Sequence, residues 1–275
     1  MTKLRLMSNN LWWNTFNTPA WEAMGADCSN EARVPGFARM YRETQPDIIG
    51  LQECSARMTR ALMIHLAEED FPYTMVWGGD TSILFRHDKF ELVDSKAFIY
   101  PEEIPGLEGS FNNLQTKSYC AAVFRLKETE GYLIFGSTHL MYKSEAALPG
   151  VEKARGWQMD RLIDQLEAFQ AKYAAPLVLV GDFNTTPSGR GVQTALERGF
   201  VHAHDVAEVA DNTTGMHYCC DAGFATELNE GDFSHSIDHI LLRNFDGKVE
   251  TYSRYCPDYY FPVSDHSALW VDVAF

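Results

Sequence analysis

The chain has 275 residues, of which 45% are hydrophobic and 13% aromatic, so it can bury a large core and nothing in its composition suggests disorder. Its 38 acidic and 23 basic residues give a formal net charge of −15, which argues against broad electrostatic binding to nucleic acid. A small phosphate substrate stays compatible with this charge, because a bound divalent cation can supply the local positive charge.

The length fits one large domain or two small ones, and no Pro/Gly/Ser-rich linker divides the chain, so we expect a single domain over residues 1–275. The N-terminus lacks the long apolar segment of a signal peptide, and no run approaches the 18 apolar residues of a membrane span. None of the six cysteines forms a Cys-x-x-Cys pair. We therefore expect a soluble, cytoplasmic protein with mostly free thiols.

The first third of the chain alternates between strand and helix patterns. Residues 3–10 alternate as a strand, whereas 12–21 have no clear period and are expected to form a loop. A helix is expected over 31–45, with Pro35 in its first turn, and a second over 55–68, with Ser55 as N-cap. Strands are expected at 47–53, 73–77, 81–86, 90–100, 117–126 and 132–138.

The remaining chain carries two further helix patterns, a long one over 144–173, interrupted near 149–150, and a short one over 189–198. Residues 200–233 have a weak pattern. Strands are expected at 236–242, 248–256 and 267–275. Because strands come in runs with helices between only some of them, the pattern favours mixed sheets packed together, with helices outside.

One strand near residue 180 ends in two side chains that can act together. Residues 176–180 form an apolar run that is typical of a strand buried on both faces, and it stops at Gly181. Asp182 and Asn184 follow two residues apart, and such side chains point the same way on an extended backbone. The same residues are also common in turns, so this motif alone decides nothing.

Polar side chains at strand ends recur along the chain. They are Asn10, Glu53, His139, Asp182, Asn184, Asp238, Asp265 and His266. Each alone has an ordinary explanation, such as a helix-start acid for Glu53. Together they fit metal-assisted attack of water on a phosphate ester, because Mg²⁺ needs only one or two carboxylates and an amide, which Glu53 with Asn10 or Asp265 would supply.

The remaining members of this set suit the proton transfers. Asp182 and His266 are both candidates for the base that accepts the proton of water, and the sequence leaves the choice open. His139 could assist the leaving group, and Asp238 is a candidate carboxylate partner that orients His266.

These motifs together resemble those of the endonuclease/exonuclease/phosphatase family, which includes deoxyribonuclease I. The motifs are Asn10-Leu11, Leu51-Gln52-Glu53, Ser137-Thr138-His139-Leu140, Gly181-Asp182-Phe183-Asn184, Ile237-Asp238-His239-Ile240 and Ser264-Asp265-His266. They follow the family's order over nearly the whole chain, and residues 83–86 with Arg155 and Gln158 resemble bacterial-type members.

The resemblance implies an α/β fold, a four-layer sandwich of two packed mixed sheets flanked by helices, with the site at one rim. It implies a Mg²⁺-dependent hydrolase of phosphate mono- or diesters, with Mn²⁺ as an alternative ion. Glu53 would be the principal ligand, assisted by Asn10 and Asp265. Asp182 would orient or deprotonate water, with Asn184 beside it. His139 would assist the leaving group, and Asp238 would pair with His266.

Aromatic residues flank two of these motifs. Trp12 and Trp13 directly follow Asn10, and Tyr259 and Tyr260 shortly precede Asp265, so they must lie near the rim. They either pack over the sheet ends or form a stacking wall for a ring of the substrate.

Two further residues are candidates for substrate contact, His217 in a loop that resembles bacterial relatives, and Arg155 on the long helix. The cluster of His and Cys in 200–235 matches no recognised zinc spacing. We expect a small phosphoester substrate; the alternatives are a nuclease acting on DNA or RNA, and a catalytically silent scaffold that binds a phosphorylated ligand. Substrate identity, one or two metal ions, oligomeric state and pathway stay open.

Overall fold

Two β-sheets of mixed strand direction lie face to face in the computed structural model, which describes residues 2–13, 18–212, 223–224, 226, 232–255 and 257–274. Within these residues the first sheet has seven strands, in the order β10 (Ala207–Ala210), β12 (Lys248–Tyr255), β13 (Ala268–Ala274), β1 (Lys3–Asn10), β2 (Ile48–Gln52), β4 (Ser82–Arg86) and β3 (Tyr73–Val76). The second has six, β5 (Phe90–Ile99), β6 (Ser118–Leu126), β7 (Tyr132–His139), β8 (Leu177–Asp182), β11 (Asp238–Arg243) and β9 (Val201–His202).

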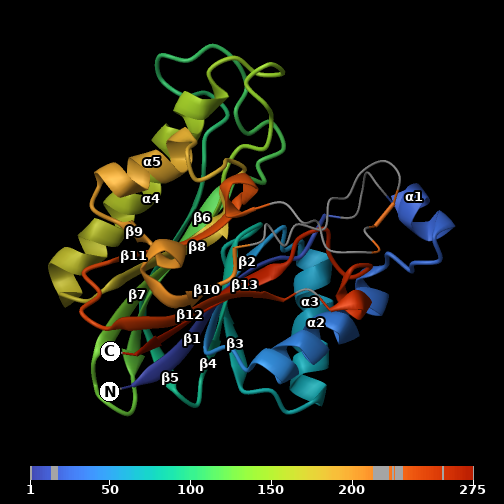
Figure 1. The fold of residues 1–275 in the computed structure, drawn as a ribbon, viewed down its shortest axis with the longest axis horizontal. Coiled ribbons are helices and arrows are strands. Elements are labelled where there is room, and N and C mark those ends of the chain that lie inside the picture. Colours follow the sequence, from blue (N-terminus) through green and yellow to red (C-terminus); the bar gives the residue numbers. More distant parts are fainter. Residues whose placement is uncertain are drawn as a thin grey trace.

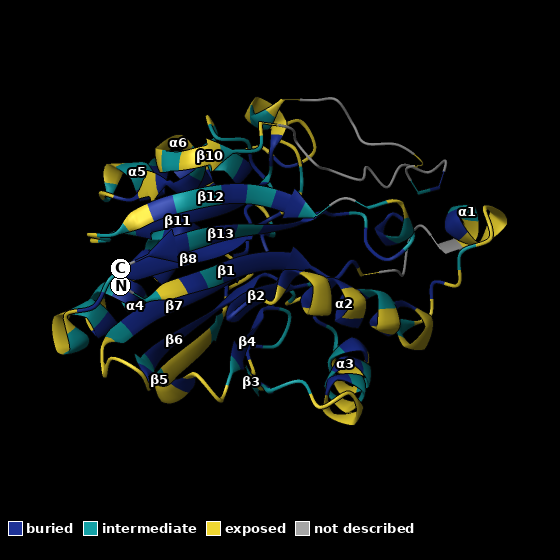
Figure 2. Ribbon diagram, turned by 60° about the horizontal axis from the view of Figure 1, so that its bottom comes forward, coloured by how far each residue is buried: buried dark blue, intermediate teal, exposed yellow. Residues whose placement is uncertain are grey.

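Helices cover the outer face of each sheet (Figure 1). Apolar residues of α2 (Asn30–Thr44) and α3 (Ala56–Glu68) form a buried cluster with the first sheet. Those of α4 (Val151–Tyr173) and α5 (Arg190–Glu197) form another with the second sheet. Figure 2 shows the central strands mostly buried and the outer sides of the helices exposed. The expected four-layer sandwich with two mixed sheets is therefore confirmed.

The two sheets approach each other closely at Gly50, near the end of β2. A Cβ added at Gly50 would lie 2.3 Å from Val180 Cγ2 and 2.9 Å from Ser137 Oγ, so only glycine fits between the sheets here. Ser137 Oγ donates to the Leu51 carbonyl at 3.0 Å and accepts from Gln52 Nε2 at 3.0 Å. These two bonds cross from one sheet to the other and fix the relative position of the residues that follow.

Three local expectations need correction. The loop expected over 12–21 contains the short helix α1 (Thr18–Ala23), since Trp21 is fully buried in a stack with Trp12 at 3.9 Å and a helical turn directs it inward. The helix expected from 144 begins only at Val151, because Gly150 precedes it in a left-handed conformation. Pro35 lies beyond the first turn of its helix, which begins earlier because the Ser29 hydroxyl caps it.

The expected Ser55 cap is confirmed, with Ser55 Oγ accepting from the Met58 amide at 3.2 Å. The region of weak pattern contains β9, the short helix α6 (Ala203–Val206) and β10. Cys54 and Cys120 are buried free thiols, and Cys28 is also buried. Among the helices of the described residues, none has the length and apolar character needed to cross a membrane.

Candidate active site

The predicted site residues of five motifs come together at one rim because of strand register. On β1 and β2, which run parallel, Asn10 lies opposite Gln52, so Glu53 follows directly beside it. On the other sheet, His139 at the end of β7 lies opposite Asp182 at the end of β8, and Asp182 in turn opposes Asp238 at the start of β11. Backbone pairing thus gathers groups that are far apart in sequence.

Asn10 connects the two carboxylates from opposite sheets. Its Nδ2 donates to Asp182 Oδ2 at 3.1 Å and to Glu53 Oε1 at 3.4 Å, while its Oδ1 accepts from the Trp12 amide at 2.8 Å. Glu53 has a left-handed backbone with φ of 56°, which ends the extended conformation of β2, and its carboxylate also accepts from the Trp13 amide. The carboxylate of Glu53 is therefore held by β1 and the segment that follows it, and Asn10 links it to Asp182 of the other sheet.

His139 is buried among charged groups. Its Nε2 lies 3.4 Å from Asp182 Oδ2 and 3.9 Å from Glu53 Oε1, and its Nδ1 lies 2.8 Å from Asp80 Oδ2. Lys117 Nζ lies 2.6 Å from His139 Nε2. Burial, followed by the Lys117 charge, lowers the pKa of His139 to about 4. Burial also raises the pKa of Asp80 to about 6 and lowers that of Lys117.

His266 and Asp238 form the expected carboxylate–imidazole pair. His266 Nδ1 lies 2.7 Å from Asp238 Oδ2, while its Nε2 points toward Asp182, whose Oδ2 is 3.9 Å away. The charge of Asp238 raises the pKa of His266 well above its usual value despite the opposing effect of burial. Ser264 Oγ accepts from the His266 amide at 3.2 Å and donates to the Asn10 carbonyl at 2.8 Å, which attaches this loop to β1.

Asp265 has a buried carboxylate oxygen, Oδ1, with no hydrogen bond from the described residues. Burial raises the pKa of this carboxyl to about 7, and the Glu53 carboxylate contributes in the same direction. Three possible metal-ligand atoms, one each from Glu53, His139 and Asp182, also lie within 4.8 Å of one another. Neighbouring carboxylates that repel each other, with one buried oxygen that lacks a hydrogen bond from the described residues, fit a hard divalent cation such as Mg²⁺.

Asn184 lies at the border of this centre. Its amide N–H donates to Asp182 Oδ1 at 2.9 Å, and its Nδ2 donates to the Leu140 carbonyl at 3.0 Å. Its backbone φ of 52° is left-handed, so the expected turn and the expected site residue are both present at this position. The two interpretations of the Gly-Asp-Phe-Asn motif are therefore compatible.

The aromatic residues expected at the rim divide into buried and exposed. Trp12 is 4% exposed and has the Arg33 guanidinium 4.9 Å from its ring, and Tyr260 is fully buried with its hydroxyl donating to Asn9 Oδ1 at 2.9 Å. Tyr259 is partly buried, with Arg39 over its ring at 3.8 Å. Only Trp13, at 40% exposed, presents a large part of its ring to solvent.

Of the other two predicted substrate contacts, Arg155 is the one among the described residues. Arg155 is buried and donates to the Met141 carbonyl at 2.8 Å, to the Lys143 carbonyl at 2.5 Å and to Glu152. His217 lies outside the described residues, as do three of the zinc candidates, Cys219, Cys220 and Asp221. Of the described candidates, His202 contacts His239 at 3.0 Å and His204 stacks on Phe233 at 3.7 Å.

Sequence reasoning missed Asp80 and Lys117, the two charged neighbours of His139. Asp80 belongs to a Gly-Gly-Asp turn, and Lys117 is the first residue of an expected strand, so both have an ordinary local explanation. A buried lysine is the unusual feature, but burial is a property of the fold that a sequence pattern does not reveal.

A family model described as "Endonuclease/Exonuclease/phosphatase family" matches residues 11–266. The chain matches none of the curated proteins. Among solved structures, one similar to it is an endonuclease/exonuclease/phosphatase family protein from Bacteroides thetaiotaomicron (TM-score 0.75, 21% identity, covering 100% of this chain and 98% of that one).

Two other similar structures carry more specific names. One is a mannosyl-6-phosphatase from Bacteroides thetaiotaomicron (TM-score 0.73, 20% identity, covering 99% and 100%). The other is TDP2 from D. rerio in complex with a single-stranded DNA product (TM-score 0.67, 16% identity, covering 100% of both chains). At these identities the likeness to solved structures extends to the fold alone.

Proposed function

Because the chain belongs to the endonuclease/exonuclease/phosphatase family, we propose that it is a Mg²⁺-dependent hydrolase of phosphate mono- or diesters, with Mn²⁺ as an alternative ion. The observation that carries the proposal is the convergence of Glu53, His139, Asp182 and the Asp238–His266 pair at one rim. These groups come from both sheets, and all of them except the half-buried Glu53 are buried, whereas charged side chains in proteins are ordinarily exposed.

We assign the metal to Glu53, Asn10 and Asp265. Glu53 and Asp265 offer carboxylate oxygens, of which Asp265 Oδ1 lacks a partner among the described residues, and Asn10 offers an amide. When bound, the ion supplies neutralisation of the charge that develops on the phosphoryl oxygens. Rotation of the Asn10 amide, which now directs its NH₂ group to the carboxylates, is needed for its oxygen to serve as a ligand.

The protein groups act on water and on the ester. Asp182 lies between Asn10, His139 and His266, so a water molecule in contact with its carboxylate is oriented from three sides. Either Asp182 or His266 takes the proton of this water as its oxygen attacks phosphorus. Asn184 lies beside Asp182 and holds the water or a phosphoryl oxygen. His139 stabilises the charge on the leaving group or the pentacovalent phosphorus.

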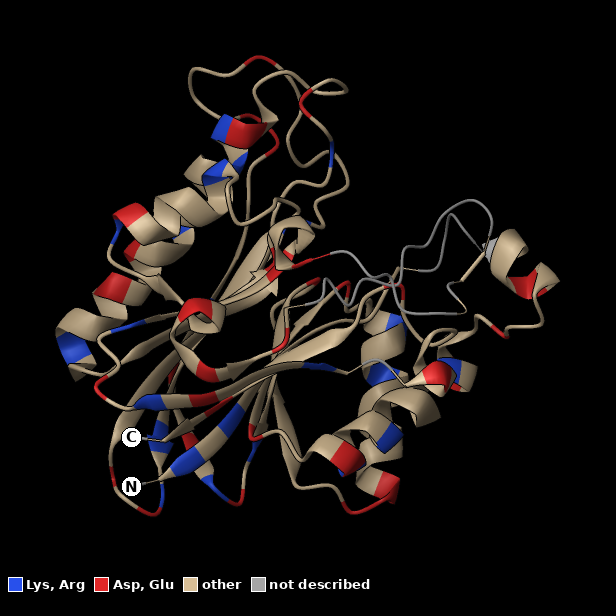
Figure 3. Cartoon of the chain, viewed as in Figure 1, with Lys and Arg blue, Asp and Glu red and all other residues tan. Residues whose placement is uncertain are grey.

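A small phosphoester is the favoured substrate. The net charge of −15 supports it, and Figure 3 shows Lys and Arg interspersed with Asp and Glu along the helices and strands. The similar structure named as a mannosyl-6-phosphatase also supports it. The second candidate is a nuclease, which the likeness to TDP2 with bound DNA product supports.

A substrate panel tests the proposal. Purified protein is incubated with abasic DNA, poly(A), sphingomyelin, inositol phosphates and sugar phosphates, each with Mg²⁺, Mn²⁺ or chelator. We expect hydrolysis that requires the ion and prefers a small phosphoester. Preference for DNA or RNA would support the nuclease, and no hydrolysis of any ester with either ion would favour a catalytically silent scaffold.

A further inference from the structure

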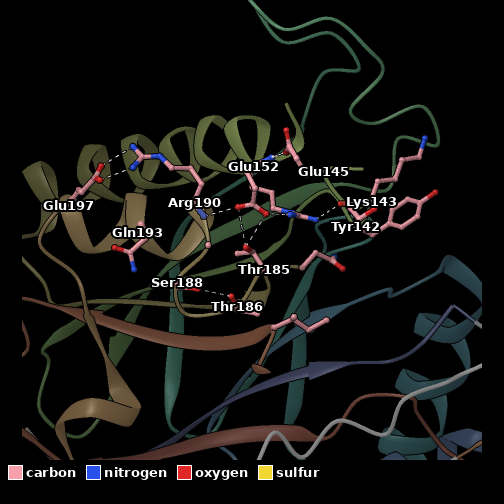
Figure 4. A pocket seen from close by; sticks show the side chains of 15 residues that line it. Tyr142, Lys143, Glu145, Glu152, Thr185, Thr186, Ser188, Arg190, Gln193 and Glu197 are labelled. Atoms are coloured by element: carbon pink, nitrogen blue, oxygen red, sulfur yellow. Dashed lines mark hydrogen bonds and ion pairs between the residues drawn. The ribbon is translucent and has the colours of Figure 1, made fainter. Parts of the chain in front are cut away.

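A groove of about 780 Å³ adjoins the catalytic rim. Of the residues that line it, Asn184 and Arg155 are the two that the sequence predicts as site residues. Its walls come from three segments, the loop after β7, the N-terminal part of α4, and the loop between β8 and α5, and are completed by α5 itself and by Ile237 (Figure 4). Asn184 belongs to both the groove and the centre, because its amide binds Asp182 while its side chain lines the groove. The groove therefore borders the proposed catalytic centre at Asn184.

Tyr142 lines the groove and also lies close to Lys117, which contacts His139. Its ring is 53% exposed and lies 5.3 Å from Lys117 Nζ, which itself contacts His139 at 2.6 Å. An exposed tyrosine ring next to a catalytic group offers an apolar face and a polar tip to a ligand. Any substrate whose phosphate lies at the rim would have its remaining part within reach of this ring.

The groove has fixed walls. Glu152 accepts from the Arg190 amide at 2.8 Å and from Thr185 Oγ1 at 3.3 Å, and it also pairs with the buried Arg155. Arg155 in turn holds the Met141 and Lys143 carbonyls. One ion pair thus joins all three segments, so the groove is preformed for a ligand.

The charges along the groove are largely satisfied within the protein. Arg155 pairs with Glu152 and Arg190 with Glu197, and Glu145 accepts from two backbone amides. Among the described residues, Lys143 is the one lining cation without an ion pair. A polyanion, such as a nucleic acid backbone or a ligand with several phosphates, would find too few cations here.

The groups left for a ligand are neutral, and they both donate and accept hydrogen bonds. Thr186 and Ser188 contribute hydroxyls 3.1 Å apart, and Gln193, which also lines the groove, donates its Nε2 to the Pro187 carbonyl. Hydroxyls and amides of this kind match the hydroxyl groups of a ligand, which also donate and accept. Tyr142 and Ile237 are the only large apolar residues of the lining in the described chain, too few for a lipid chain or for both faces of a base.

We propose that this groove binds the polyhydroxylated part of the substrate, so that the enzyme acts on phosphate esters of sugars or cyclitols. The inference rests on the proposed function, since it adds the substrate class to that reaction. Tyr142 stacks on the ring of the ligand, and Thr186, Ser188 and Gln193 bind its hydroxyls.

The proposed role of the groove is tested by the selectivity of the enzyme between substrates, not by its rate on any one of them. The kcat/KM is measured with Mg²⁺ for hexose 6-phosphates, inositol monophosphates, AMP and p-nitrophenyl phosphate. We expect the wild type to prefer a hexose or inositol phosphate. Tyr142→Ala and Gln193→Ala should each lower the ratio of this kcat/KM to that for p-nitrophenyl phosphate about tenfold, through KM, and Tyr142→Phe should retain it. Gln165→Ala, on the same helix layer away from the groove, is the matched control.

Preference for AMP or p-nitrophenyl phosphate, or an equal loss on all substrates in both variants, would overturn the groove assignment while the hydrolase stands. If the wild type hydrolyses nothing, the thermal stability of wild type, Tyr142→Ala and Gln193→Ala is measured with the same hexose and inositol phosphates. Stabilisation of the wild type alone would keep the groove while the proposed hydrolysis fails. If these ligands do not stabilise the wild type either, both the groove assignment and the proposed hydrolysis are wrong.

Discussion

The catalytic rim and the neighbouring groove are built in different ways. At the rim, Asn10, His139, Asp182 and Asp238 occupy paired positions on strands, so backbone hydrogen bonds of the sheets determine where their side chains lie. In the groove, the side chains belong to loops and helix ends, and a single ion pair between Glu152 and Arg155 joins them. The rim can therefore stay constant while the groove changes with small alterations of the loops, which separates chemistry from selectivity.

The largest expected effect concerns the rim. Glu53→Ala and His266→Ala should each reduce kcat by roughly 10²–10⁴-fold on every substrate, because one removes a carboxylate ligand and the other a proton-transfer group. Steady-state kinetics measure the loss, and circular dichroism checks the fold. Glu68→Ala and His87→Ala, both exposed positions, are the controls. Near-normal rates in either rim variant would remove the assigned role.

Low pH should destabilise the fold through His239, a buried residue in contact with the groove-lining Thr185. His239 is buried, with Nε2 2.8 Å from the Thr185 carbonyl, and burial lowers its pKa from 6.5 to about 4. Between these two pH values the unfolded chain binds a proton that the folded chain does not, so stability is full above about pH 6.5 and falls as the pH decreases. The contribution of His239 alone to this loss of unfolding free energy should reach roughly 3 kcal/mol near pH 4.

Urea unfolding between pH 7 and pH 4 measures this loss. His239→Gln lacks the titrating ring, so its stability should be lower at neutral pH but should depend less on pH. An unchanged slope in this variant would assign the acid sensitivity to other groups.

Arg155→Met should affect the groove walls. The variant removes the guanidinium that binds two backbone carbonyls and the partly exposed Glu152. This loss should lower the free energy of unfolding by roughly 2 kcal/mol. The ratio of kcat/KM for sugar phosphates to that for p-nitrophenyl phosphate should decrease. Arg161→Met, an exposed residue of the same helix, should change stability by less than about 0.5 kcal/mol. Equal effects of the two variants would contradict the joining role of Arg155.

The smallest effect should come from Trp13, although it is the exposed aromatic of the N-terminal pair. Its backbone amide, not its ring, binds Glu53, so Trp13→Ala should leave kcat within about threefold. Trp12→Ala should instead destabilise the fold by roughly 3–5 kcal/mol, because its buried ring stacks on Trp21. A large rise in KM for Trp13→Ala alone would assign its ring to the substrate.

The contrast between rim and groove also explains what could be predicted from the sequence. Strand patterns with polar ends predict the rim, because the period of two and the apolar runs determine both the strand and the residue that follows it. The groove has no such pattern, since Tyr142, Ser188 and Gln193 occur in ordinary loop and helix contexts. Arg155 is an example: the sequence predicts a substrate contact for it, whereas its bonds to the Met141 and Lys143 carbonyls depend on loop conformation and could not be predicted.

The rim gathers residues from both ends of the chain, which has a consequence for biosynthesis. β1 pairs along its length with β13, from Lys3 opposite Ala274 to Ser8 opposite Leu269, and Ser264 holds the Asn10 carbonyl. During translation, Asn10 therefore emerges long before Asp265 and His266, and the rim is complete only after those two residues have been synthesised. A nascent chain on the ribosome should remain inactive, with one edge of β1 open to wrong pairing, until β13 becomes available.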